Sequence, residues 1–122
     1  MIEGRIDMNL EAFIELDVLL ERATTPQRFL VDTGFNGFIS VSQELVDQLG
    51  LKLLDVQEGI TADGRRGYFD TVEITVLWHG ESRTMQAQIL DEALIGTRLL
   101  RGSRIRADWV RDGTFVVEPI HS

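Results

Sequence analysis

Residues 29–40 read Phe-Leu-Val-Asp-Thr-Gly-Phe-Asn-Gly-Phe-Ile-Ser, an apolar run that leads directly into an acid, Asp32. The three bulky residues before Asp32 have the composition of a buried strand, and Gly34 and Gly37 allow the backbone to turn sharply after it. A carboxylate at the end of a core strand loses part of its hydration, which is costly unless it is hydrogen-bonded or shares a proton. Thr33 can donate and accept, and Gly34 leaves its N–H open to close approach. The stretch therefore predicts a cradle for a functional carboxylate.

The same tripeptide has a second interpretation, an ordinary surface turn in which the Asp caps its own backbone. Chance alone would place Asp-Thr-Gly in roughly 1–2 % of chains of this length. The flanks favour the first interpretation, because apolar residues such as Val31 and Phe35 lie on both sides of the tripeptide.

The run Asp32 to Phe35 resembles the signature of the retropepsin-like (clan AA) aspartic peptidases, and more closely their small prokaryotic single-domain group, whose motif reads Asp-Thr-Gly-Phe. A second block, Leu94-Ile95-Gly96 followed by residues 97–100, resembles the apolar-apolar-glycine segment and short helix that lie beside the catalytic loop in that family. The blocks occur in the family's order, and the resemblance extends over nearly the whole chain. It implies an all-β fold, a single-lobe closed β-barrel of the acid protease type with one or two short helices.

The bulk composition restricts the classes of function. At 122 residues we expect one domain, residues 1–122. With 12 Lys and Arg against 20 Asp and Glu, the net charge of −8 argues against a nucleic-acid or membrane partner. The chain has no cysteine, which excludes disulfides, thiolate zinc sites and a cysteine nucleophile. No apolar run reaches membrane-spanning length and no secretory signal is recognisable, so a cytoplasmic location is the default expectation.

The amino-terminal segment has two interpretations. Ile2-Glu3-Gly4-Arg5 spells a processing-protease site used in expression vectors, so residues 1–7 are either native or vector-derived, with Met8 as the first native residue. The apolar alternation continues through Ile6 into Met8 without a break, and members of the resembled group often open similarly. We therefore favour a native segment.

Turn signals divide the remaining chain into short elements. Alternating apolar residues predict strands over residues 2–8 and 12–20, joined to the Asp32 strand by a polar connection over residues 22–27 that contains a proline. A short helix is predicted between a Ser42 N-cap and Gly50. Three hairpins are predicted around glycine-containing turns: residues 56–71 about Asp63-Gly64, residues 72–90 about His79-Gly80, and residues 104–120 about Asp112-Gly113. Eight to ten strands and two helices in all are typical of a closed all-β domain.

The resemblance implies the roles of the residues around the acid. Asp32, Thr33 and Gly34 would be catalytic: Asp32 as one carboxylate of a dyad, Thr33 through a hydrogen bond across a two-fold axis, and Gly34 by orienting the carboxylate. Phe35 and Asn36 follow at positions expected to contact substrate. A pepsin-like enzyme carries two such acids, whereas this chain has one, so a homodimer is expected. Either terminal segment could build its interface.

The hairpin about Asp63-Gly64 stands between the two family blocks and resembles the flap that closes over substrate. Ala62, Asp63 and Gly64 are therefore expected to contact substrate. Arg65 and Arg66 either favour acidic substrates or are simply solvated, and the solvated interpretation is favoured because exposed charges usually have no specific effect.

The main hypothesis is an aspartic endopeptidase acting on peptide or protein substrates, with no cofactor and no metal. His79 in a turn and His121 at the end of the chain predict neither a metal site nor a Ser–His pair. One alternative is a catalytically silent retropepsin-like module for dimerisation or peptide binding. Another is an unrelated all-β domain with a chance Asp-Thr-Gly.

Overall fold

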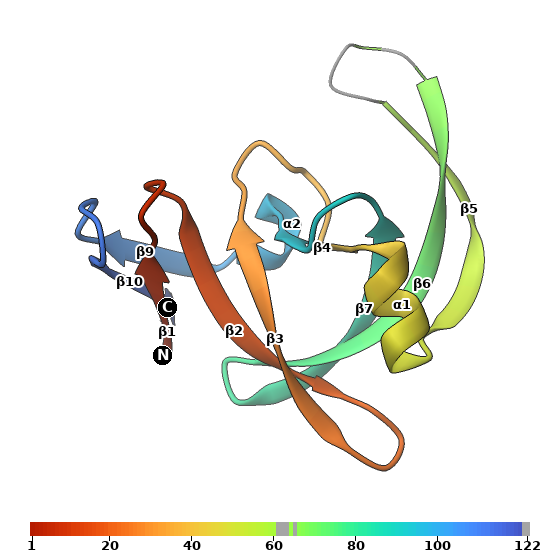
Figure 1. Cartoon of the computed structure of the whole chain (residues 1–122), viewed down its shortest axis with the longest axis horizontal. Helices are drawn as coiled ribbons and strands as arrows, with labels where there is room; N and C mark the ends of the chain where they lie inside the picture. The colour runs from red at the N-terminus through yellow and green to blue at the C-terminus, as the bar shows by residue number, and fades with distance from the viewer. Residues whose placement is uncertain (61–63, 65, 121–122) are drawn as a thin grey trace.

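The computed structural model describes residues 1–60, 64 and 66–120, and within these ranges the side chains outside 55–60 and 66–69 (Figure 1). The described residues form ten strands and two short helices. They are β1 (Ile2–Ile6), β2 (Ala12–Leu19), β3 (Thr24–Val31), β4 (Ile39–Val41), α1 (Gln43–Leu49), β5 (Lys52–Ile60), β6 (Arg66–Trp78), β7 (Glu81–Ile89), β8 (Leu94–Ile95), α2 (Thr97–Leu100), β9 (Ser103–Ala107) and β10 (Thr114–Pro119).

Six of the strands close into a barrel. The strands follow the order β6-β7-β4-β8-β3-β2, and β2 pairs back to β6 where Val18 lies opposite Val76. The predicted closed β-barrel with short helices is therefore confirmed at this level. Closure leaves these strands without a free edge over the paired segment, which satisfies backbone groups that an open sheet would expose.

The barrel interior follows the period-two alternation of the sequence. Along β2, every second side chain is at most 3 % exposed, whereas Glu15 and Asp17 between them point to solvent. Phe29 on β3 and Val76 on β6 are fully buried against the same core. On β3 only Phe29 is fully buried, while Leu30 and Val31 are half-buried, so the strand that leads to Asp32 packs on the core through one face and is less buried than the sequence predicts.

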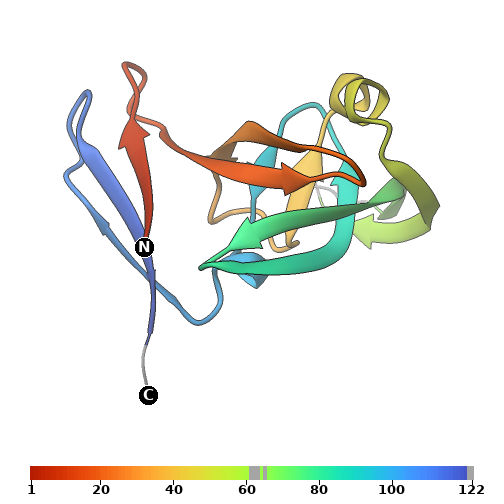
Figure 2. The same cartoon turned by 90° about the horizontal axis from the view of Figure 1, so that it is seen from below.

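A second layer extends from β2. The strands β1, β10 and β9 continue the sheet in that order, with β1 hydrogen-bonded between β2 and β10. Figure 2 shows these three strands standing beside the barrel as a separate layer. Ile6, Phe115 and Val117 bury the inner face of this layer, with at most 2 % of each exposed.

The helix α1 has the predicted ends. Ser42 accepts a hydrogen bond from the Leu45 N–H (3.1 Å), and Gly50 adopts the left-handed conformation at the other end (φ 65°). Leu45 and Val46 bury its apolar side. Within the described residues, no helix has the length and apolar character needed to cross a membrane.

The connection before β3 differs from the prediction. The turn comprises only residues 20–23, and Pro26 lies inside β3 opposite Asp17. The hydrogen bonds between β2 and β3 explain how proline is accommodated. Leu20 N–H donates to Ala23 O, and in an antiparallel pair only every second residue is hydrogen-bonded to the partner strand. Pro26 therefore stands at a position where an N–H would point away from β2, so its missing N–H breaks no bond. At this point β3 has no described neighbour on its other side, because it meets β8 only at Leu30 and Val31.

The predicted carboxyl-terminal hairpin is present, but its first strand is shorter than expected. β9 ends at Ala107 rather than Val110, because Asp108 O accepts a hydrogen bond from Val110 N–H and turns the chain into a wider loop. Gly113 closes this loop against Asp108 O, where a side chain would collide with backbone. The turn at His79 and Gly80 has positive φ at both residues (50° and 81°), as a two-residue hairpin turn requires.

His79 makes a contact that the sequence did not predict. Its Nε2 lies 2.8 Å from Ser103 Oγ, so a Ser–His pair exists after all, formed because the β6–β7 turn packs against the start of β9. Nδ1 is buried and has no hydrogen-bond partner among the described residues, so no acid orients the ring for nucleophilic catalysis. The pair therefore joins the barrel to the outer layer.

We expect His79 to make stability depend on pH. Burial, followed by the charges of the amino terminus and Arg83, lowers the pKa of His79 below its ordinary value of 6.5. The unfolded chain then binds more protons than the folded chain below about pH 6.5, so folding stability falls as the pH drops through this range. His79→Asn fits the positive φ and should lose less unfolding free energy than the wild type between about pH 8 and pH 5, as measured by urea unfolding. An equal loss in both proteins would contradict this role.

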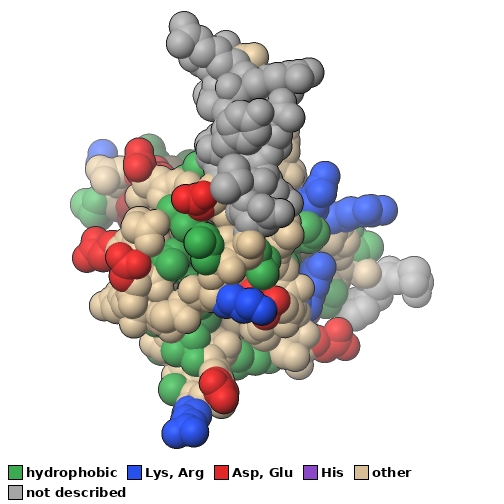
Figure 3. Space-filling model, turned by 90° about the vertical axis from the view of Figure 1, so that its right-hand side faces the viewer, with side chains coloured by type: hydrophobic (Ala, Val, Ile, Leu, Met, Phe, Trp, Pro, Cys, Tyr) green, Lys and Arg blue, Asp and Glu red, His purple; other side chains and the backbone are tan. Residues whose placement is uncertain are grey.

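Figure 3 shows the side of the molecule that faces right in Figure 1. Acidic and basic side chains are interspersed there among uncharged ones. This face therefore presents charge of both signs.

Candidate active site

Asp32 follows directly after β3 and is held there by β8. The two strands run parallel, with Leu30 opposite Leu94 and Val31 opposite Ile95. The Asp32 N–H continues the pairing by donating to Ile95 O (3.0 Å). The backbone of the acid is thus tied to the interior of the barrel while its side chain, which is half-buried, remains accessible.

The carboxylate accepts a hydrogen bond from the loop that follows. Asp32 Oδ1 lies 2.8 Å from the Gly34 nitrogen, which donates its N–H as the sequence predicts. A self-capping Asp turn makes the same contact, so this bond does not distinguish the two interpretations. The pairing of Leu30 and Val31 with β8, which places Asp32 at the end of a barrel strand, favours the first. Phe29 is fully buried, whereas Thr33 and Gly34 are exposed. The acid is therefore presented at the end of a barrel strand on an exposed loop.

The second family-like block holds this loop in place. Thr97 N–H donates to Phe35 O (2.9 Å), Gly96 N–H to Phe38 O (3.0 Å) and Arg98 N–H to Gly37 O (3.3 Å). These backbone bonds connect the Asp32 loop to β8 and α2 across about sixty positions of sequence. The structure thus brings the two blocks side by side.

Glycines make this close approach possible. A Cβ on Gly96 would collide with Gly37 O and lie 2.7 Å from Phe35 O, so the two segments could not keep their present separation. The Phe35 ring lies over both glycines, since a Cβ on Gly37 would lie 2.6 Å from its Cζ and one on Gly96 2.8 Å from its Cδ2. Phe35 therefore packs the loop as well as bordering the acid, and Asn36 beside it is exposed.

Ser40, on β4, is a fully buried polar residue that the sequence analysis did not single out. Its Oγ donates to Glu92 O (2.7 Å) and accepts from the Leu94 N–H (3.1 Å). Glu92 lies just before β8, and Leu94 is the first residue of β8. Ser40 therefore fixes the position of β8, which in turn holds Asp32.

Replacing Ser40 by Ala removes two hydrogen bonds, one from the buried Leu94 N–H and one to Glu92 O, which is part-buried. We expect the free energy of unfolding to fall by about 2 kcal/mol, measured by urea denaturation. Ser42→Ala is the matched control, because it removes a single, part-buried cap bond and should cost about 1 kcal/mol. An equal cost in the two variants would contradict the role of Ser40.

A hollow of about 280 Å³ lies along the outer face of β2 and β3, and Leu30, two positions before Asp32, lines it. Arg28, Leu30 and Asp32 occupy alternate positions of one chain segment and share a face, so the hollow approaches the acid from Leu30. Its lining combines an apolar floor with charged edges: Glu11, Phe13, Arg28, Leu30, Glu92 and Ala93.

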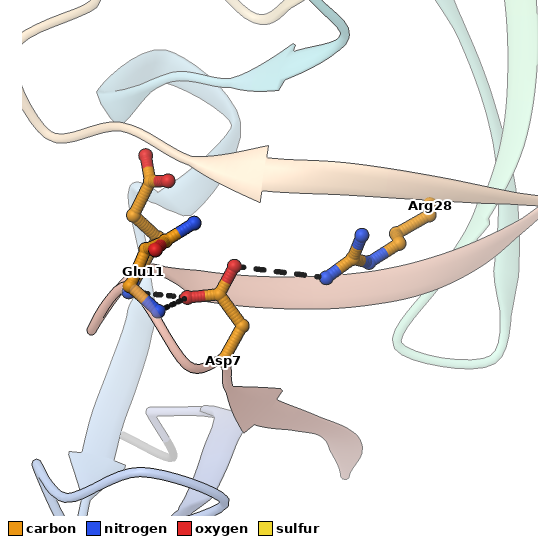
Figure 4. Close-up of polar contacts among 4 residues, drawn as sticks. Asp7, Glu11 and Arg28 are labelled. Atoms are coloured by element: carbon orange, nitrogen blue, oxygen red, sulfur yellow. Dashed lines mark hydrogen bonds and ion pairs between the residues drawn. The ribbon is translucent and has the colours of Figure 1, made fainter.

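Arg28 is positioned by two neighbours. Its guanidinium carbon lies 3.6 Å from the centroid of the Phe13 ring, a cation–π contact, and its Nη2 lies 4.0 Å from Asp7 Oδ2. Figure 4 shows Asp7 between Arg28 and the backbone of the β1–β2 turn, where Asp7 Oδ1 accepts from Asn9 N–H and Glu11 N–H (both 2.9 Å). Arg28 could have been predicted from the sequence, because it lies four positions before Asp32 and so on the same face of the strand. Phe13 could not, because it lines the hollow only as a result of its pairing with Leu30.

The predicted flap residues are partly outside the described ranges. The β5–β6 hairpin forms, with Ile60 opposite Arg66, but its strands are longer than predicted: β5 begins at Lys52, and β6 continues past Thr71 to Trp78, so that one strand belongs to both this hairpin and the next. The hairpin extends beyond the barrel at the end where the Asp32 loop lies (Figure 1). Gly64 is exposed with φ 83°. Ala62 and Asp63 lie outside the described residues.

Comparison with known proteins gives no assignment. No family model matches this chain, and neither a curated protein nor a solved structure does.

Proposed function

We propose that this protein is a retropepsin-like aspartic endopeptidase that hydrolyses peptide bonds as a homodimer. The observation that carries the proposal is the placement of Asp32. Its strand is part of the barrel, its loop is held by the Leu94-Ile95-Gly96 block, and its carboxylate accepts the Gly34 N–H at 2.8 Å. The residues of both family-like motifs thus meet at one place.

In the proposed dimer, two Asp32 carboxylates approach within hydrogen-bond distance and hold one proton between them, as in the aspartic proteases. The ionised carboxylate takes a proton from a water molecule, whose oxygen attacks the scissile carbonyl carbon. The protonated carboxyl donates a hydrogen bond to the carbonyl oxygen. When the C–N bond breaks, the proton passes to the leaving nitrogen, and the dyad is left with one shared proton. Thr33, which is exposed on the same loop, would bind across the two-fold axis.

The hollow beside β3 supports an extended peptide substrate. Phe13 and Leu30 give it an apolar floor, so it suits an apolar or aromatic side chain next to the bond that is cut. Glu11 and Glu92 place negative charge at its edge. We therefore expect peptides with an apolar residue near the cut bond to be preferred.

Cleavage of a mixed peptide library between about pH 4 and 7, where a shared-proton dyad can function, tests the proposal. New cut sites should appear, and the rate per chain should fall on dilution as dimers dissociate. A folded dimer that produces no cut site would favour the silent binding module. A stable monomer without activity would favour an unrelated all-β domain.

A further inference from the structure

The strand β9 forms an edge of the ten-stranded order, with β10 on one side. Within the described ranges, no strand pairs with its other side. Figures 1 and 2 show β9 in the outer layer, which meets the barrel at the start of the strand, where Ser103 contacts His79. An open edge can accept a further strand through backbone hydrogen bonds.

The ladder shows which backbone groups are free to do so. Ile120 N–H donates to Gly102 O, and Asp108 N–H donates to Thr114 O (2.9 and 3.0 Å). Because the bonds of an antiparallel pair alternate, the residues between them with even numbers face β10. The N–H and C=O groups of Ser103, Ile105 and Ala107 therefore point outward. The position of Pro119 agrees with this alternation. Pro119 has no N–H, and it lies opposite Ser103, at a pair that makes no hydrogen bond between β9 and β10.

The edge also exposes apolar side chains. Ile105 lies opposite Val117 and so belongs to the inner, apolar face of the outer layer, yet it is 38 % exposed because nothing described covers that side. Trp109 follows the strand, is 56 % exposed and meets Phe115 edge-on at 6.4 Å between ring centroids. An added strand would extend this apolar face and cover part of both side chains.

The charge of this segment is opposite to that of the rest of the chain. Residues 98–111 contain five Arg and one Asp, a net charge of +4, while the remaining residues carry a net −12. All five arginines are exposed. Arg104 and Arg106 lie on the strand itself, with Arg106 paired to Glu118 on β10 (Nε–Oε1 3.2 Å). By contrast, the face in Figure 3 mixes both signs.

We propose that the β9 edge binds an extended acidic peptide segment of another protein as an added strand. Acidic residues at alternate positions would lie beside Arg104 and Arg106, and the apolar residues between them would pack beside Ile105. A second copy of β9 fits less well. If two β9 strands paired antiparallel with Ile105 opposite Ile105, Arg104 of each copy would lie opposite Arg106 of the other, and like charges would repel. The site is separate from Asp32 and does not depend on the proposed peptidase activity.

Calorimetric titration of the Asp32→Asn chain, residues 1–122, tests the proposal without substrate cleavage. The probe is a capped peptide with the sequence Glu-Val-Glu-Val-Glu-Val-Glu, compared with the same peptide carrying Lys in place of Glu and with an N-methylated acidic peptide that cannot pair. We expect only the first to bind. Arg104→Gln with Arg106→Gln should weaken binding at least about tenfold, and Ile105→Pro by a similar factor, because it removes an outward N–H while keeping the bonds to β10.

The matched control is Arg22→Gln with Lys52→Gln, two exposed cations elsewhere that change the net charge equally. This control should bind within about twofold of the parent. Equal weakening in the control and the edge variant would overturn the proposal, because net charge would then explain the binding. Unchanged binding of the N-methylated peptide would exclude strand addition even if Ile105→Pro failed to fold. Tighter binding of a single-stranded oligonucleotide, or a dimer that Ile105→Pro converts to a monomer, would assign the edge to another partner.

Discussion

Asp32→Asn is expected to reduce peptide cleavage by about 10³-fold or more, because an amide can neither take a proton from water nor hold the shared proton. The substitution changes little else. The amide oxygen can still accept the Gly34 N–H, and the Asp32 N–H bond to Ile95 O belongs to the backbone. The variant should therefore fold, as circular dichroism and urea unfolding would show, while its cleavage of the library peptides is lost.

Mixing the two proteins sharpens this experiment. If each site needs two Asp32 carboxylates, a roughly tenfold excess of Asp32→Asn places nearly every wild-type chain in an inactive mixed dimer, so the rate per wild-type chain should fall about tenfold. Gln88→Ala, a change on β7 that keeps Asp32, is the control added in the same excess, and the total rate should then rise with the added chains. A rate unaffected by excess Asp32→Asn would mean that one chain suffices, and the dyad would be wrong.

Gly96→Ala is expected to lower the free energy of unfolding by about 3 kcal/mol, a large effect for one methyl group. The added Cβ would collide with Gly37 O and approach Phe35 O, and both are backbone atoms that cannot rotate away. Relief requires the Asp32 loop to separate from α2, which breaks the bonds that hold it. Urea unfolding gives the loss of stability, and cleavage should fall with it even under conditions where the variant is folded.

Gly50→Ala is the matched control for that experiment. Gly50 has φ 65° and open space around its Cβ position, so the same substitution costs only the backbone strain of the left-handed conformation, about 1 kcal/mol. It lies at the end of α1, away from Asp32, and should leave cleavage per folded chain unchanged. If Gly96→Ala were no more destabilising than Gly50→Ala, the prediction would be wrong, because the close contact between the Asp32 loop and the Gly96 segment would then not contribute to stability.

Several elements could be predicted because their signals are local. The alternation in β2, the Ser42 and Gly50 ends of α1, and the His79-Gly80 turn each depend on residues within a few positions of one another. Predictions of the residues at which a strand begins or ends were less accurate. Pro26 resembles a loop residue, although its missing N–H is harmless at a position that faces away from β2, and β9 stops early because Asp108 binds within its own loop.

By itself, the sequence determined that a strand ends at Asp32, that glycines follow it, and that short strands and turns suit a closed β-barrel, whereas it overestimated the burial of that strand. These features follow from the conformational preferences and polarity of neighbouring residues. Only the tertiary structure decided what surrounds the acid: the parallel pairing with β8, the Ser40 contacts, and the meeting of Phe13 with Arg28. It likewise decided that β9 is an open edge. Such contacts depend on strand order and register between distant segments. The periodicity of one segment shows which of its faces is buried, but not which strand pairs with it.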